Sequence, residues 1–183
     1  DLLAAIDNSL EKKLTIWDVV SGTMVAETMI SVDVICDINF NPKYPDLLVS
    51  TGKEHISWWK VYRGIGTIQS VAQPDYETYL RARFIICLTH NDKGDLITGD
   101  SNGTIYVWGD GGNKITNFIK HAHDSDLPRA RKARQKTYLR ARFIICLTHN
   151  DKGDLITGDS NGTIYVWGDG GNKITNFIKH AHD

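Results

Sequence analysis

Cysteine is scarce in the sequence, and its three copies stand far apart. Cys36, Cys87 and Cys146 each lie alone in an apolar run. Isolated cysteines form neither a disulfide framework nor the paired spacing of a zinc site. We therefore expect three buried free thiols that pack as small hydrophobic side chains in a reducing, intracellular compartment.

The sequence also lacks an excess of charge and a long apolar run. The formal net charge is −1, which gives no general attraction to nucleic acid or to an acidic membrane surface. No apolar stretch approaches the roughly 20 residues that span a bilayer. The chain starts at Asp1, without an initiator Met or an apolar leader, which favours a fragment with no secretory signal. These absences predict a cytoplasmic protein with no membrane or nucleic-acid partner.

What the sequence does contain is repetition, and the plainest repeat is literal. Residues 78–124 and 137–183 are the same 47 residues, offset by 59. Structural repeats ordinarily diverge, because only core and turn positions are constrained. Two explanations stay open: a recent tandem duplication, or an error in sequence assembly or gene modelling.

A second, diverged repeat consists of short runs rich in Ile, Val, Thr, Tyr and Trp, bounded by Asn, Asp and Gly, which predicts strands. No segment keeps an apolar period of about 3.6 residues long enough to predict an amphipathic helix. The expected strands are 2–6, 14–19 and 24–29 in a partial unit; 34–40, 47–51, 55–61 and 66–71 in a full unit; 84–88, 95–99, 104–108 and 114–119 in the next; and their copies between 143 and 178.

Tryptophans recur at the same place in each unit, at Trp17, Trp59, Trp108 and Trp167, with spacings of 42, 49 and 59 residues. The first spacing matches the roughly 40–45 residues of a four-stranded propeller blade. We predict an all-β chain of about four propeller blades, the last a copy of the third. Such a chain forms a partial, open propeller.

Several phrases resemble a known family. The residues Leu-Thr-Ile-Trp-Asp at 14–18 carry the Trp-Asp ending of WD40 repeats. Together with Ile6-Asp7 and the runs 49–59, 94–108 and 119–124, they occur in this order in the first propeller of the echinoderm microtubule-associated protein-like family. The resemblance implies a partial WD40 propeller of about three blades over 1–124, followed by a basic linker or duplication junction at 125–136 and the duplicated blade at 137–183. It also implies tubulin or microtubules as partner and a cytoplasmic, cytoskeletal location.

The same resemblance implies a structural network inside the blades. In WD40 repeats a Thr, an Asp and a Trp join a His in buried hydrogen bonds that lock a turn against a strand. Residues at the corresponding positions are Thr98, Asp100 and Trp108, and in the copy His123, Thr157, Asp159 and Trp167. In the middle unit Lys53 aligns with Asp100, which leaves that network incomplete.

Catalytic, cofactor and metal sites are not expected. A Ser/Thr-His-Asp triad needs an oxyanion hole and a nucleophile elbow, and neither is visible. The histidine pairs at 121 and 123 and at 180 and 182 lack a third metal ligand with suitable spacing. Gly64-Ile65-Gly66 lacks the third glycine and the helix of a phosphate site.

One basic cluster stands out between the two copies, with Arg129, Arg131, Lys132, Arg134 and Lys136. Its interpretations are contact with the acidic tails of tubulin, nuclear import, or a solvated linker. We favour the linker, because the cluster sits where the literal repeat is spliced in.

The function expected from the pattern is a non-catalytic platform that binds other proteins through propeller loops. Alternatives are a WD40 adaptor in another complex, such as a ubiquitin ligase or a ciliary assembly; an enzyme; and a non-functional truncated or duplicated gene model. Four blades of a larger ring leave apolar end faces and an unpaired strand edge open, so we also predict marginal stability and self-association.

Overall fold

The structure is a computed structural model that describes residues 1–72, 74, 84–109, 113–120, 122–123, 142–168, 171 and 173–179. The predicted basic linker at 125–136, His121, His180 and His182 lie outside the described residues. All elements of the described part are strands, and none of it is a helix long and apolar enough to cross a membrane.

The strands fall into four consecutive units, which we call the first to fourth blades. The first contains β1 (Leu2–Ile6), β2 (Lys12–Asp18) and β3 (Met24–Ile30). The second contains β4 (Ile35–Phe40), β5 (Leu47–Gly52), β6 (His55–Tyr62) and β7 (Thr67–Ala72). The third contains β8 (Ile85–His90), β9 (Leu96–Asp100), β10 (Ile105–Trp108) and β11 (Ile115–Ile119). The fourth contains β12 (Ile144–His149), β13 (Leu155–Asp159), β14 (Ile164–Gly168) and β15 (Lys173–Ile178).

Each blade is an antiparallel meander in which every strand pairs with the next one along the chain. The first and second blades are joined at their outer strands by a single parallel pair, Glu27 with Thr67. The first blade has three strands, and its β1 occupies the place of β5, β9 and β13 in the other blades. It therefore has no counterpart of β4, β8 and β12.

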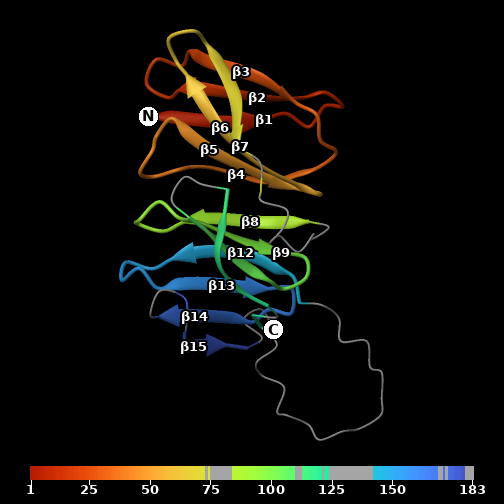
Figure 1. The fold of residues 1–183 in the computed structure, drawn as a ribbon, viewed down its shortest axis with the longest axis vertical. Helices are drawn as coiled ribbons and strands as arrows, with labels where there is room; N and C mark the ends of the chain where they lie inside the picture. Colours follow the sequence, from red (N-terminus) through yellow and green to blue (C-terminus); the bar gives the residue numbers. More distant parts are fainter. Residues whose placement is uncertain are drawn as a thin grey trace, which may run out of the picture.

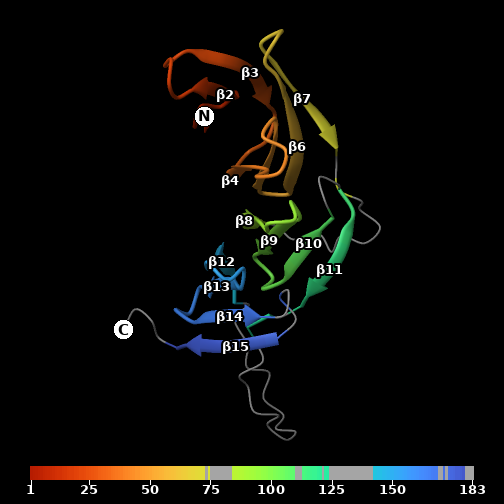
Figure 2. The ribbon, with the colours of Figure 1, turned by 90° about the vertical axis from the view of Figure 1, so that its left-hand side faces the viewer.

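The four blades stack face to face in a curved row (Figures 1 and 2). The innermost strands β4, β8 and β12 lie on the concave side, and the outer strands β7 and β11 lie on the convex side. Apolar clusters fill the space between successive blades; for example, Trp58 of the second blade packs with Tyr106 and Trp108 of the third. The all-β partial propeller predicted from the sequence is confirmed.

The tight turn between β9 and β10 of the third blade is fixed by an aspartate and a glycine. The Asp100 Oδ1 atom accepts hydrogen bonds from the amides of Asn102 and Thr104, both at 2.8 Å. Gly103 then takes a φ of 75°, which side chains disfavour. A Cβ at Gly103 would also lie 2.6 Å from the Arg142 carbonyl oxygen, so the turn lies directly against the chain that enters the fourth blade.

The two identical copies have different surroundings, and the cysteines show the consequence. Cys87 in β8 is buried because the fourth blade covers it, and its thiol contacts the carbonyl oxygen of Ile144 at 3.5 Å. Cys146, the same residue in β12, is exposed because the described chain has no blade beyond it. Cys36 is exposed as well. The prediction of three buried thiols is therefore right for Cys87 and wrong for the other two.

Candidate functional site

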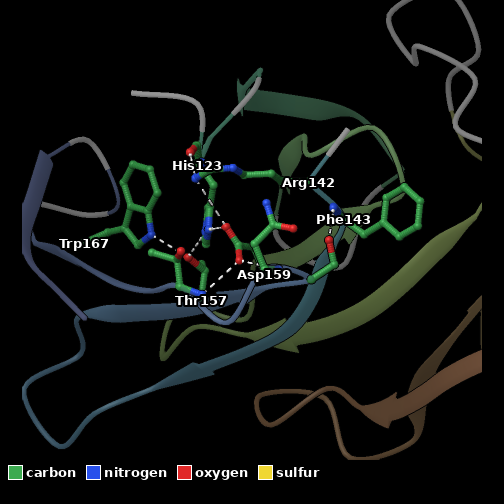
Figure 3. Close-up of polar contacts among 9 residues, drawn as sticks. His123, Arg142, Phe143, Thr157, Asp159 and Trp167 are labelled. Carbon is green, nitrogen blue, oxygen red and sulfur yellow. Dashed lines mark hydrogen bonds and ion pairs between the residues drawn. The ribbon is translucent and has the colours of Figure 1, made fainter. Parts of the chain in front are cut away.

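The candidate site is the hydrogen-bond network that the sequence predicts. It lies at the junction of the third and fourth blades. Its members come from the segment after β11, which carries His123, and from β13 and β14, which carry Thr157, Asp159 and Trp167. Figure 3 shows these side chains converging between the blades.

The imidazole of His123 bridges two side chains of the fourth blade. Its Nδ1 lies 2.9 Å from Asp159 Oδ2, and its Nε2 lies 2.6 Å from Thr157 Oγ1. A carboxylate only accepts hydrogen bonds, so Nδ1 carries the proton and donates it to Asp159. The Nε2 atom and the Thr157 hydroxyl share the second hydrogen bond of the ring.

Trp167 and the backbone complete the network (Figure 3). The Trp167 Nε1 group donates to Thr157 Oγ1 at 2.9 Å, so this hydroxyl serves two partners at once. Asp159 Oδ1 accepts the amides of Asn161 at 2.9 Å and Thr163 at 3.0 Å, which fixes the β13–β14 turn. The network thus connects a turn and two strands of the fourth blade to a residue of the third.

Arg142 adds a charged group at the edge of this network. Its guanidinium donates to the His123 carbonyl oxygen at 2.7 Å and lies 3.7 Å from Asp159 Oδ2. The side chains of His123 and Asp159 are fully enclosed, and the His123 ring stands edge-on to Tyr165 with centroids 4.3 Å apart. Thr157 has no exposed surface. A substrate has no path to these groups, so the arrangement suits holding two blades together.

The third blade places its members in the same way. Trp108 Nε1 donates to Thr98 Oγ1 at 3.1 Å, and Asp100 holds the turn as described above. All three residues have no exposed surface. Trp58 of the second blade meets the Trp108 ring edge-on at 5.4 Å. The structure therefore brings together Thr98, Asp100 and Trp108 at the junction of the second and third blades.

The alignment of Lys53 with Asp100 in the second blade is wrong by one residue. Ile35 pairs with Gly52 in this blade as Ile85 pairs with Asp100 in the next, so Gly52 holds the aspartate's position. The turn is one residue shorter than in the third blade, because nine positions separate Ser50 from Trp59 and ten separate Thr98 from Trp108. Lys53 instead pairs with Asp33 at 2.5 Å.

The second blade replaces the network with a local one that the sequence prediction missed. Trp59 Nε1 donates to Ser50 Oγ at 2.8 Å, and His55 Nε2 lies 2.7 Å from the same oxygen. His55 belongs to the blade's own turn rather than to the preceding blade. Burial lowers the pKa of His55 to about 4, so the ring is neutral near pH 7. The short spacing between Ser50 and Trp59 is the sequence signal for it.

The first blade keeps the aspartate, which the sequence prediction also missed. Asp7 Oδ1 accepts the amides of Ser9 and Lys13, both at 3.2 Å, as Asp159 does in the fourth blade. The Ser9 side chain and the Lys13 amide hold the pKa of Asp7 below its usual value. Ala5 stands at the threonine position, and Trp17 Nε1 turns to Thr15 Oγ1 at 3.0 Å. Asp7 is exposed on the outer face of the blade.

Comparisons with known proteins agree on one family. A sequence model described as "Echinoderm microtubule-associated protein first beta-propeller" matches residues 1–129. Echinoderm microtubule-associated protein-like 2 of Mus musculus is 30% identical over 175 residues, which are 95% of this chain and 24% of that protein. The 77 kDa echinoderm microtubule-associated protein of Lytechinus variegatus is 33% identical over 165 residues, 90% of this chain and 22% of that protein. Echinoderm microtubule-associated protein-like 2 of Homo sapiens is 36% identical over 124 residues, 68% of this chain and 19% of that protein.

The chain spans less than a quarter of the length of these relatives. The alignment with the mouse protein runs through both copies of the repeat, whereas the family model ends at residue 129, ahead of the second copy.

Proposed function

The chain belongs to the echinoderm microtubule-associated protein family, as part of its first β-propeller, and we propose that it is a non-catalytic platform that binds tubulin in microtubules. The match of the family model over residues 1–129 carries this proposal. The relatives are named as microtubule-associated proteins. A location on cytoplasmic microtubules follows from the same proposal.

The enclosure of the polar residues supports a non-catalytic role. A hydrolase built on Thr157, His123 and Asp159 would need these side chains in an open cleft beside a donor for an oxyanion. They are instead closed off beneath Trp167 and Tyr165. Their proposed role is to lock the third blade to the fourth.

We place the binding surface on the turns that follow the innermost strands. In each of three blades an asparagine side chain braces this turn: Asn41, Asn91 and Asn150 accept the amides of Lys43, Lys93 and Lys152 at 2.9, 3.0 and 3.0 Å. The three lysines are exposed and stand at equivalent positions. The turns lie along one edge of the row of blades, at the left of Figure 1.

Rigid turns that present a lysine at the same place in three blades suit a repetitive protein surface. In two of these turns the lysine stands between aspartates, Asp92 and Asp95 or Asp151 and Asp154, so the charge pattern is mixed. Bracing fixes each lysine relative to the blade, which lowers the conformational entropy lost on binding. Several charges that act together also make association dependent on salt. This row of lysines is the surface that we propose for tubulin.

Co-sedimentation of the full chain with stabilised microtubules tests the proposal. We expect binding that weakens as salt is raised, and at least about a tenfold loss of affinity in the triple variant Lys43→Glu, Lys93→Glu, Lys152→Glu. A matched control carries the same charge change at the opposite ends of the strands: Lys13→Glu, Lys120→Glu, Lys179→Glu. The control should bind as the unaltered chain does.

Three results would overturn parts of this proposal. Failure of the folded chain to co-sediment at any salt concentration would remove tubulin as the partner, and an adaptor role in another complex would replace it. Equal losses in the two triple variants would remove the row of lysines as the surface. A loss seen only when the charges of residues 129–136 are neutralised would assign binding to that basic cluster.

A further inference from the structure

A small cavity lies between the third and fourth blades. Its volume is about 70 Å³, and its floor is apolar: Ile97, Ile105, Val107 and Ile119 of the third blade face Leu155 of the fourth. Ile97, Ile105 and Leu155 are buried. Both walls of the cavity therefore come from blades that pack on each other within the chain.

The rim of the cavity lies among the turns at one edge of the blades. Asn117 and Gly153 line it and are exposed, and Gly153 directly follows Lys152. A Cβ on Gly171, which also lines the rim, would meet nothing within 4 Å. A ligand thus has a path to the apolar floor from this edge.

The cavity exists because Val107 stands where the preceding junction has a tryptophan. Val107 precedes Trp108 in β10 as Trp58 precedes Trp59 in β6, and the two pairs have the same register in their blades. Each of Val107 and Trp58 faces the next blade, Trp58 at the second-to-third junction and Val107 at the third-to-fourth. A valine fills less space than a tryptophan, so a void remains beside it.

The surface that covers this position is the same at both junctions. The covering residues are copies of one another: Leu96, Tyr106 and Trp108 beside Trp58, and Leu155, Tyr165 and Trp167 beside Val107. The Trp58 ring meets Trp108 edge-on, with ring centroids 5.4 Å apart. The chain itself therefore shows that this covering surface accepts an aromatic ring.

The size and polarity of the cavity suit one such ring. A water-sized group needs roughly 10–15 Å³, so the cavity holds about five to seven non-hydrogen atoms. The polar side chains at the rim already serve the backbone: Asn117 accepts the Phe118 amide at 2.8 Å, and Asn91 accepts the Lys93 amide at 3.0 Å. Apolar cavities stay dry and take apolar molecules such as benzene. The fitting ligand is uncharged.

We propose that this cavity is a binding site for a single uncharged aromatic ring, which takes the place that Trp58 takes at the preceding junction. The ring lies between Val107 and Leu155 and adds apolar contact between the third and fourth blades. A free small aromatic molecule and an aromatic side chain of a bound protein present the same chemistry to the site.

Methyl NMR of the full chain, labelled at the isoleucine δ1 carbons, tests the site with benzene as the probe. We expect saturable shifts at the three isoleucines of the cavity, Ile97, Ile105 and Ile119. Their copies Ile156, Ile164 and Ile178 have the same sequence neighbours but do not line it, so their signals should stay in place. No shift at the first set, or equal shifts in both sets, would overturn the proposal.

Val107→Trp supplies the ring from the chain itself. It should weaken benzene binding at least about tenfold, because the added indole fills the site. Val107→Phe should act in the same way and asks less of the surrounding packing. Val166→Trp makes the same change at the copy of Val107, which faces away from the third blade, and should bind benzene as the unaltered chain does. Undiminished benzene binding by folded Val107→Phe would contradict the assignment.

Co-sedimentation with microtubules separates the two sources of the ring. If a bound protein supplies it, Val107→Trp should lower microtubule affinity at least about tenfold, whereas Val166→Trp should not. Equal affinity of the two variants assigns the site to a free aromatic molecule. Benzene binding needs no tubulin, so failure of the site and failure of the proposed function are separate results.

Discussion

At the scale of single residues, the Thr157 hydroxyl is the shared atom of the network between the third and fourth blades. It serves Trp167 and His123, and none of the three has more than slight exposure. Thr157→Val keeps the shape of the side chain but leaves the indole N–H and the imidazole nitrogen without this partner. We expect a loss of about 2 to 3 kcal/mol in the free energy of unfolding, measured by urea denaturation.

A matched control comes from an exposed threonine of the same blade. Thr175 in β15 donates to the Val166 carbonyl oxygen at 3.1 Å but is open to water. Thr175→Val should change stability by less than about 0.5 kcal/mol. Equal effects of the two substitutions would contradict the structural role of the network.

His90 and its copy His149 are histidines at the ends of the innermost strands β8 and β12, and they allow a second prediction. Burial lowers the pKa of His90 to about 4, and neither ring nitrogen has a hydrogen-bond partner in the described part of the chain. Phe40 occupies the same position in the second blade. We expect His90→Phe to stabilise the chain, because it removes an unpaired buried polar ring. His149→Phe should have a smaller effect, since His149 lies in the less covered blade and its pKa is lowered less.

The pH dependence follows from the direction of the shift. The folded chain holds His90 neutral, whereas the unfolded chain binds a proton near pH 6.5, so stability present above pH 6.5 is lost as the pH falls toward 4. The loss from this group is on the order of 2 kcal/mol. The difference in the free energy of unfolding between pH 7 and pH 4.5 should be smaller for His90→Phe than for the unaltered chain. An unchanged pH dependence in this variant would count against the buried neutral ring.

The resemblance to WD40 repeats selects Thr157, Asp159 and Trp167, whose positions are fixed relative to one another by one turn and two strands. It misses His55 and misplaces Lys53, since a turn shortened by one residue shifts the alignment without changing the composition. It also misses Asp7, because the threonine that would accompany it is Ala5. When one member of the network is replaced, the sequence no longer matches the motif. The remaining hydrogen bonds are then visible only in the structure.

At the scale of strands and blades, the third and fourth blades approach each other closely at Gly99 in β9. A Cβ there would lie 2.5 Å from Ile144 Cγ2 and 2.9 Å from Cys87 Sγ. Ile144 begins β12 and has no exposed surface, so it has no room to move. We expect Gly99→Ala to destabilise the chain by about 2 kcal/mol through overpacking of this junction.

The copy provides the control for this prediction. A Cβ at Gly158 in β13 would meet only the Cys146 Sγ atom, at 2.5 Å. The Cys146 side chain is exposed and free to rotate away. Gly158→Ala should therefore cost less than about 1 kcal/mol by the same denaturation assay. If the two substitutions cost the same, crowding within a blade rather than between blades would be the cause.

Strand positions were the most predictable feature of the fold. β-branched and aromatic runs bounded by Asn, Asp and Gly locate nearly every strand to within about two residues, because turns and cross-strand pairs are local. The parallel contact between Glu27 and Thr67 has no such local signal. The exposure of Cys146 was not predictable either, because it depends on which blades stand beside its strand rather than on the strand itself. Cys36 lies at the register shift between Ile35 and Asp37, which the composition of the run does not indicate.

At the scale of the whole molecule, position in the row of blades decides the environment of identical sequences. Cys87 and Cys146 share their neighbours along the chain but differ in burial, and burial also raises the pKa of the Cys87 thiol. The thiolate is the reactive form, so Cys87 is protected in two ways. Any experiment that reports on these two thiols separately measures how well the fourth blade covers the third.

Thiol labelling under native conditions tests this difference in burial between Cys87 and Cys146. Cys36 and Cys146 should react promptly with an aromatic disulfide reagent, whereas Cys87 should react at least about 100-fold more slowly, at the rate at which the junction opens. Cys146→Ser should remove one prompt equivalent, and Cys87→Ser should remove only the slow one. Prompt reaction of all three thiols would mean that the fourth blade separates from the third in the folded chain. The locking role of His123, Thr157 and Asp159 would then fail with it.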